Sequence, residues 1–221
     1  MDYRNTLILT ARATLTAMAV SALMLGCGSS DDTATQGDAS QTTNQETGAP
    51  MSDNAANEIA IMETDFGDIT IDFLEDVAPK HAENFKRLAR EGFYDGISFH
   101  RVIPGFIIQA GDPLSKDQTQ RARHGTGGPG YTIPAEISAL HGKGVLAAAR
   151  KPDQANPQRR SSGSQFYITL APTPNLDHQY SVYGEVTDGM DVALKIADVQ
   201  RDPRDNPVDP ILIKTIRIED R

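Results

Sequence analysis

This chain of 221 residues has no tryptophan and a single cysteine, Cys27. A disulfide within the chain needs two cysteines, so no such bridge can hold the fold together. Basic residues are also fewer than acidic ones: the chain has 21 lysine and arginine residues and 30 aspartate and glutamate residues, which gives a net charge of -9. An acidic chain repels phosphate backbones, which argues against nucleic acid as its main partner.

Long hydrophobic runs and common ligand-binding motifs are missing as well. The uncharged run over residues 13–25 is too short for an ordinary membrane-spanning helix. The segment 113–130 ends in a glycine-rich stretch, residues 125–130, that lacks the lysine and hydroxyl residue of a P-loop and opens no GxGxxG helix. We therefore interpret the segment 113–130 as one long ordered surface loop. His124 and His141 have no further ligand at metal-binding spacing, so we predict no metal site.

Residues 1–27 resemble a lipoprotein signal peptide. Arg4 and Arg12 precede the short apolar run, which ends in MLGC at residues 24–27, a sequence similar to the bacterial lipobox. This resemblance implies cleavage before Cys27, a diacylglyceryl group on its sulfur and acylation of its new amino group, hence a stable membrane anchor. The alternative is a plain cleaved signal peptide in which the cysteine has no role.

Two segments of different composition follow. Residues 28–57 hold five acidic residues, no basic residue and almost no large apolar side chains. Such a segment cannot offset the entropy cost of ordering by burial, so we predict a disordered acidic and polar tether. Residues 58–221 have the size and composition of one soluble domain with a sizeable core. An anchored protein of this kind faces the periplasm or the cell exterior, and Gly28, in place of the aspartate associated with inner-membrane retention, favours the outer membrane.

Within residues 58–221, strand-like alternation is interrupted by two helix-like segments. Residues 58–63 and 67–74 alternate isoleucine with polar or smaller residues, which predicts a hairpin. Residues 78–91 and 189–199 carry apolar side chains at helix spacing, which predicts two helices. Further strands are predicted within residues 98–112, 144–150, 165–170, 181–187 and 211–218. About eight strands without βαβ alternation favour an antiparallel barrel.

The most informative stretch covers residues 98–112. It predicts two short apolar strands hinged at the turn dipeptide Pro104-Gly105. In the second strand Ile107 and Gln109 point to one side, and the other side takes Phe106, Ile108 and Ala110. Arg101 and Gln109 are therefore polar groups within segments that should be mostly buried. The residues alone leave an ordinary alternative open, in which a lone strand arginine reaches solvent or pairs with a carboxylate.

Residues 99–112, FHRVIPGFIIQAGD, resemble the signature segment of the cyclophilins, the peptidyl-prolyl cis-trans isomerases. Residues 162–168 (SGSQFYI) and 176–186 (LDHQYSVYGEV) are similar to further family segments in the same order and at about the same spacing. The similarity covers about residues 58–219. It implies a mainly β fold, a closed eight-stranded antiparallel β-barrel capped by two α-helices, and an activity without a cofactor.

The implied reaction is rotation about the peptide bond before proline, against a resonance barrier of roughly 18–20 kcal/mol. A catalyst must favour the twisted state, in which the prolyl nitrogen gains a lone pair. The resemblance implies that Arg101 donates to this lone pair, and that Phe106 and Gln109 complete the catalytic set. It also implies a peptide-binding groove formed by His100, Ile107, Ala149, Arg150, Gln165, Tyr167, Leu176 and Tyr180. Core packing or surface exposure is the alternative for each of these residues.

Four positions depart from the common pattern of this family. Asn175 stands where many cyclophilins have tryptophan, which removes an aromatic wall and argues against tight binding of cyclosporin-like macrocycles. Tyr180 replaces a common histidine, and Arg150 replaces a frequent asparagine. Tyr167 replaces a frequent phenylalanine and keeps the aromatic ring.

The sequence thus predicts a monomeric, lipid-anchored prolyl isomerase that acts on unfolded or newly exported proline-containing chains. A non-catalytic module that binds proline segments is the main alternative, and Asn175 is the residue that favours it. A purely structural lipoprotein is the third hypothesis.

Overall fold

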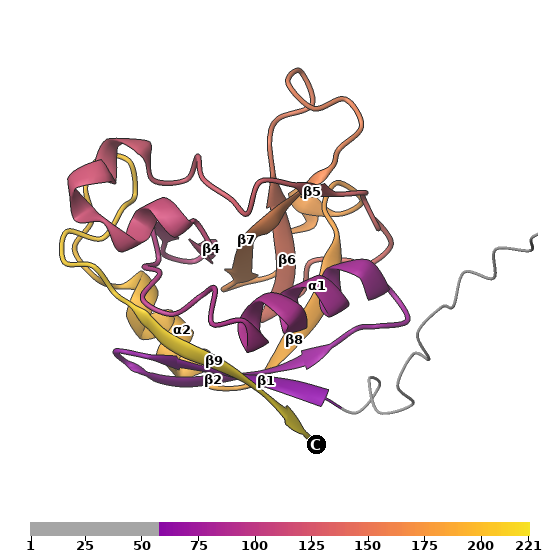
Figure 1. Ribbon diagram of the computed structural model, residues 1–221, viewed down its shortest axis with the longest axis horizontal. Helices are drawn as coiled ribbons and strands as arrows, with labels where there is room; N and C mark the ends of the chain where they lie inside the picture. Colours follow the sequence, from indigo (N-terminus) through magenta and orange to yellow (C-terminus); the bar gives the residue numbers. More distant parts are fainter. Residues whose placement is uncertain (1–57) are drawn as a thin grey trace, which may run out of the picture. The chain divides into compact units, whose positions relative to one another are not determined.

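The computed structural model describes residues 58–221 (Figure 1). The predicted signal peptide, the lipobox with Cys27 and the tether lie outside the described residues. Among residues 58–221, no helix is both long and apolar enough to cross a membrane.

The domain opens with the predicted hairpin. Strand β1 (Glu58–Thr64) pairs with β2 (Gly67–Phe73) in antiparallel register. Gly67 adopts a φ of 127° at the turn, a conformation that residues with a Cβ rarely reach. Ala60 and Met62 are fully buried on one face of β1. The hairpin therefore forms one wall of the core.

Both predicted helices are present. Helix α1 (Pro79–Arg90) has proline at its start and buries a stripe that includes Ala82, Phe85 and Ala89. Helix α2 (Met190–Ala197) follows Gly189 and buries Val192, Ala193 and Ile196. α1 packs against β7 (Ser161–Thr169), β8 (Val182–Asp188) and β9 (Ile213–Asp220). α2 packs against β2, β3 (Arg101–Ile103) and β4 (Ile107–Ala110), so the helices cover different parts of the sheet (Figure 1).

The remaining strands belong to the same sheet. They are β3 (Arg101–Ile103), β4 (Ile107–Ala110), β5 (Thr132–Ile133), β6 (Val145–Arg150), β7 (Ser161–Thr169), β8 (Val182–Asp188) and β9 (Ile213–Asp220). Short 3-10 helices stand in the connections: η2 (Pro113–Lys116), η3 (Gln118–Arg123) and η4 (Pro174–Leu176). The segment 113–130, predicted as one long loop, therefore contains two helical turns.

The prediction of a closed barrel was wrong, because the sheet is an open, curled half-barrel. Its strands run in the order β3-β4-β7-β6-β8-β2-β1-β9 with antiparallel pairing, and β5 pairs with β7. The end strands β3 and β9 do not pair with each other in this order, and an isolated bridge between Ser98 and Leu212 joins their flanks. β3 is short, and the amide of Val102 donates to the carbonyl of Asp205 in a loop instead of to a strand.

The buried side chains form two clusters on opposite faces of the sheet. Ile108 and Ala110 of β4 belong to the main core with Phe85 and Phe166. Ile107 belongs to a second, smaller cluster, whose buried members also include Val145, Ala147, Ala149, Tyr167 and Val182. The predicted alternation is thereby confirmed within β4, but Phe106, predicted on the side of Ile108, packs against the second cluster because the turn before β4 redirects it. The second cluster forms the floor of the site described next.

Candidate active site

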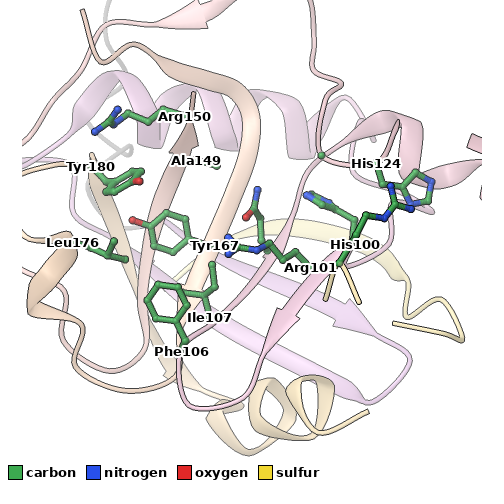
Figure 2. Close-up of a pocket in the computed structure, with 13 residues that line it drawn as sticks. His100, Arg101, Phe106, Ile107, His124, Ala149, Arg150, Tyr167, Leu176 and Tyr180 are labelled. Atoms are coloured by element: carbon green, nitrogen blue, oxygen red, sulfur yellow. The ribbon is translucent and has the colours of Figure 1, made fainter. Parts of the chain in front are cut away.

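A groove with a cavity of about 320 Å³ lies over the second cluster (Figure 2). Its walls come from β3, β4, β6 and β7, from η4, and from the loops after η3 and α2. The lining residues are His100, Arg101, Phe106, Ile107, Gln109, His124, Gly125, Ala149, Arg150, Tyr167, Leu176, Tyr180 and Arg204. All predicted site residues of the domain except Gln165 are in this set.

Arg101 stands at the first position of β3, directly opposite Gln109 of β4. This register places both side chains on the groove face. Figure 2 shows Arg101 extending across the groove toward Tyr167. Within residues 58–221, no hydrogen bond or ion pair engages its guanidinium group. Arg101 is therefore a half-buried cation with its donors available to a ligand.

The apolar part of the groove lies beside Arg101. Phe106 follows the predicted turn at Pro104-Gly105, and Ile107 packs under it in the second cluster. Tyr167 of β7 is 3% exposed and pairs in register with Gln109. Leu176 closes this part from η4. A ring the size of proline fits such an apolar recess next to a cation.

Tyr167 is held by His141, a buried histidine to which the sequence pattern assigns no role. Its hydroxyl lies 3.0 Å from Nε2 of His141, and Nδ1 of His141 lies 3.2 Å from Oδ1 of Asp177. Burial lowers the pKa of His141 and raises the pKa of Tyr167 well above its ordinary value. With Nδ1–H donating to Asp177, Nε2 accepts from the Tyr167 hydroxyl. The chain Asp177–His141–Tyr167 thus fixes the aromatic wall of the recess.

Arg150 forms the other end of the groove. Its guanidinium stacks over the ring of Tyr180 at 4.7 Å, and its Nε donates to the carbonyl of Gln179 at 2.9 Å. Asp153 pairs with both Arg150 and Arg159, at 2.5 Å and 2.8 Å. Only 4% of the Arg150 side chain is exposed, so these contacts lock its position. Arg159 is therefore part of the same ion-pair cluster as Arg150.

His100 lines the groove, as the sequence predicted, and does so as a buried, neutral imidazole. It is 5% exposed, and neither ring nitrogen has a hydrogen-bond partner among the described residues. Burial lowers its pKa to about 4, against an opposing effect of Asp112. The ring is therefore uncharged at neutral pH.

Gln165 is the one predicted groove residue outside the lining set, and its contact with the peptide stays a prediction. Its Nε2 donates to the carbonyls of Gly125 and Gly127, at 3.0 Å and 2.8 Å. Its Oε1 accepts from Nε2 of Gln109 at 3.1 Å. Asp112 fixes the same loop, because its carboxylate accepts from the amides of Gly125 and Gly127. Gln109 is therefore oriented through Gln165 by the glycine-rich loop.

Three lining residues were not predicted: His124, Gly125 and Arg204. The Arg204 guanidinium donates to the carbonyls of Ala122 and Arg121, at 3.1 Å and 3.3 Å. These bonds bring the loop after α2 to the end of η3. Nothing in the sequence links these two distant segments, so only the fold reveals this wall.

Comparisons with known proteins agree with this geometry. Residues 59–218 match the family described as cyclophilin type peptidyl-prolyl cis-trans isomerase/CLD. The peptidyl-prolyl cis-trans isomerase ppi1 of Schizosaccharomyces pombe is 40% identical over 161 residues, which cover 71% of this chain and 97% of that protein. A peptidyl-prolyl cis-trans isomerase of Synechococcus elongatus is 42% identical over 138 residues, covering 62% of this chain and 84% of the relative.

Solved structures give the same result. The crystal structure of a cyclophilin type peptidyl-prolyl cis-trans isomerase from Cryptosporidium parvum superposes with a TM-score of 0.66 at 30% identity, covering 75% of this chain and 98% of that one. A second crystal structure of that protein was obtained in the presence of the dipeptide Ala-Pro, and its TM-score is 0.64. Together with the groove, these matches show that the chain belongs to the cyclophilin-type peptidyl-prolyl cis-trans isomerases.

Proposed function

We propose that the protein isomerises Xaa-Pro bonds by gripping the proline ring in the apolar recess while Arg101 stabilises the twisted amide. The observation that carries this proposal is the unpaired guanidinium of Arg101 beside Phe106 and opposite Gln109. Its fixed donors match the lone pair that forms on the prolyl nitrogen when conjugation is lost. Planar cis and trans amides lack this lone pair, so the interaction favours the transition state selectively.

The other groove residues hold the peptide for this step. Tyr167, fixed by His141, and Leu176 enclose the ring, and Gln109 is oriented by Gln165 toward the peptide backbone. The neighbourhood of Ala149 and Arg150 accommodates the residue before proline. Isomerisation needs no nucleophile and no proton transfer, because rotation breaks no covalent bond.

An isomerase assay on the full-length chain tests the role of Arg101. Arg101→Ala should lower kcat/KM by about 10²–10³, the usual effect of removing one preorganised donor from a developing charge. Arg217→Ala on β9 is the matched control, because it removes an arginine whose Nε bonds Glu219 away from the groove. Arg101→Ala with the activity of the wild type would contradict the mechanism.

The non-catalytic binding module is the second candidate function, and Asn175 beside Leu176 is the residue that favours it. NMR exchange spectroscopy on a proline peptide separates the two. Binding accompanied by enhanced cis-trans exchange supports the isomerase, and binding without it supports the module.

We further propose that the domain is lipid-anchored through Cys27 and serves exported chains at the cell envelope. The lipobox-like MLGC sequence at residues 24–27 and the acidic segment 28–57 support this proposal. Wild-type protein expressed in a Gram-negative bacterium should partition into detergent after phase separation, and Cys27→Ser should remain in the aqueous phase. Aqueous partitioning of both proteins would reject the anchor.

A further inference from the structure

The groove carries positive charge although the chain as a whole is acidic. Its lining contains Arg101, Arg150 and Arg204, and no aspartate or glutamate is part of it. The chain nevertheless has more acidic than basic residues, with a net charge of -9. This segregation of charge points to the ligand, because a cationic cleft concentrates anionic groups.

The positive charge at the Arg204 end is not cancelled by its neighbours. Asp202 pairs with Arg121 at 3.3 Å, and Asp205 pairs with Arg201 at 3.7 Å. Arg204 bonds backbone carbonyls, and within residues 58–221 no carboxylate pairs with it. Together with the unpaired Arg101, this end of the groove therefore retains a net positive charge.

The Arg150 end also retains positive charge. Two guanidinium groups, those of Arg150 and Arg159, share the single carboxylate of Asp153. The stack of Arg150 on Tyr180 fixes one of these cations at the groove wall, as Figure 2 shows for the two labelled side chains. A fixed cation loses little side-chain entropy when a ligand carboxylate approaches it.

We propose that the groove selects proline segments flanked by acidic residues, with Arg150 and Arg204 as the specificity-determining residues at its two ends. This inference rests on the proposed function for its site and adds the class of substrate. The apolar recess takes the proline ring, and the carboxylates on either side of the proline face the two cationic ends.

Three peptides test the proposal on the full-length chain. They differ only at the two residues that flank one proline, which are both glutamate, both glutamine or both lysine. NMR exchange spectroscopy gives the catalysed rate for each, and titration of backbone amide shifts gives each Kd. At low salt we expect kcat/KM to be about tenfold higher for the glutamate peptide than for the glutamine peptide, because an ion pair at each end of the groove contributes about threefold. The lysine peptide should be slowest, and 1 M NaCl should remove most of the difference.

Arginine variants locate the selectivity. Arg204→Gln and Arg150→Gln should each lower the glutamate-to-glutamine ratio by about threefold. Arg217→Gln, on β9 outside the groove, should leave the ratio unchanged. Arg204 is exposed, so its variant tests the proposal even where loss of the buried Arg150 disturbs folding.

The three-peptide experiment distinguishes a wrong substrate class from a wrong proposed function. Equal rates and equal Kd values for the three peptides would overturn the acidic preference while the isomerase assignment stands. Absence of exchange on the glutamine peptide would contradict the isomerase assignment, and the order of Kd values would still decide the acidic preference. A ratio that neither Arg150→Gln nor Arg204→Gln changes would also overturn the proposal.

Discussion

Three histidines of the domain, His81, His100 and His141, are at most 5% exposed. Burial lowers the pKa of each below the ordinary value of histidine, and that of His100 falls to about 4. Each imidazole is therefore neutral where an unfolded chain would already take up a proton. The consequence is a domain that acid destabilises before its carboxylates titrate.

We predict that the free energy of unfolding falls as the pH is lowered from about 6.5 toward 4. In this window the unfolded state binds more protons than the folded state, so stability rises with pH. The difference between the ordinary pKa of 6.5 and about 4 for His100 limits its contribution to about 3 kcal/mol. Urea midpoints measured between pH 7.5 and 5 check the sign, and midpoints that rise on acidification would contradict it.

A second prediction concerns the hydroxyl of Tyr167. Tyr167→Phe leaves Nε2 of the buried His141 without a partner, which should cost about 1–3 kcal/mol of stability. Tyr131→Phe is the matched control, because that hydroxyl bonds Asn84 at an exposed site and should cost less than about 0.5 kcal/mol. Urea denaturation of both variants measures the difference, and equal losses would exclude a structural role for the Tyr167 hydroxyl.

At the scale of single elements, close approach of β4 to β7 depends on one glycine. Gly111 follows β4 with a φ of 91°, and a Cβ there would lie 2.1 Å from the carbonyl oxygen of Ser164. The turn glycine Gly105 has a similar φ of 71° but no neighbour within 4 Å of such a Cβ. Alanine substitutions at the two glycines therefore separate the cost of backbone strain, present at both, from the cost of a steric clash, present only at Gly111.

We predict that Gly111→Ala costs more than about 3 kcal/mol, because strain and overpacking add. Gly105→Ala should cost only about 1–2 kcal/mol, the strain of a left-handed residue with a Cβ. Thermal unfolding of the two variants measures the contrast. A Gly111→Ala variant as stable as Gly105→Ala would show that β4 and β7 can move apart.

Local patterns predicted most elements, because alternation and helix spacing depend on near neighbours. They did not reveal which face of a strand is inward: Ile59 and Ile61 marked β1 as a strand, yet Ala60 and Met62 are the residues buried completely. Both faces of a strand share the same period, so a larger side chain does not define the core face. The 3-10 turns of the segment 113–130 were missed because each is too short to show a periodic pattern, although Asp112 caps the first of them through the amide of Leu114.

The catalytic residues of the groove could be predicted because they are near neighbours in the sequence. Arg101, Phe106 and Gln109 lie within one short hairpin, and its resemblance to a known family carries their arrangement. Arg204 and His124 reach the groove through loop contacts between segments far apart in the chain, which no local pattern encodes. Gln165 lies in a family motif, but its partners show a supporting role that the motif alone does not reveal.

At the scale of the whole molecule, the described domain contains both hydrophobic clusters and the complete groove. We predict that residues 58–221 fold and isomerise proline peptides without residues 1–57, with kcat/KM within about twofold of the full-length chain. The same exchange assay on both proteins measures this. A loss of activity in the shorter chain would assign a direct role to the amino-terminal segment.

The pairing of β1 with β9 places the first and last strands of the domain beside each other, from Glu58 opposite Asp220 to Thr64 opposite Ile213. The sheet is therefore incomplete until β9 has left the ribosome. Contacts between such distant segments form late, because the long intervening chain must first close into a loop. The emergence of β9 from the ribosome thus sets the earliest time at which this domain can complete its sheet.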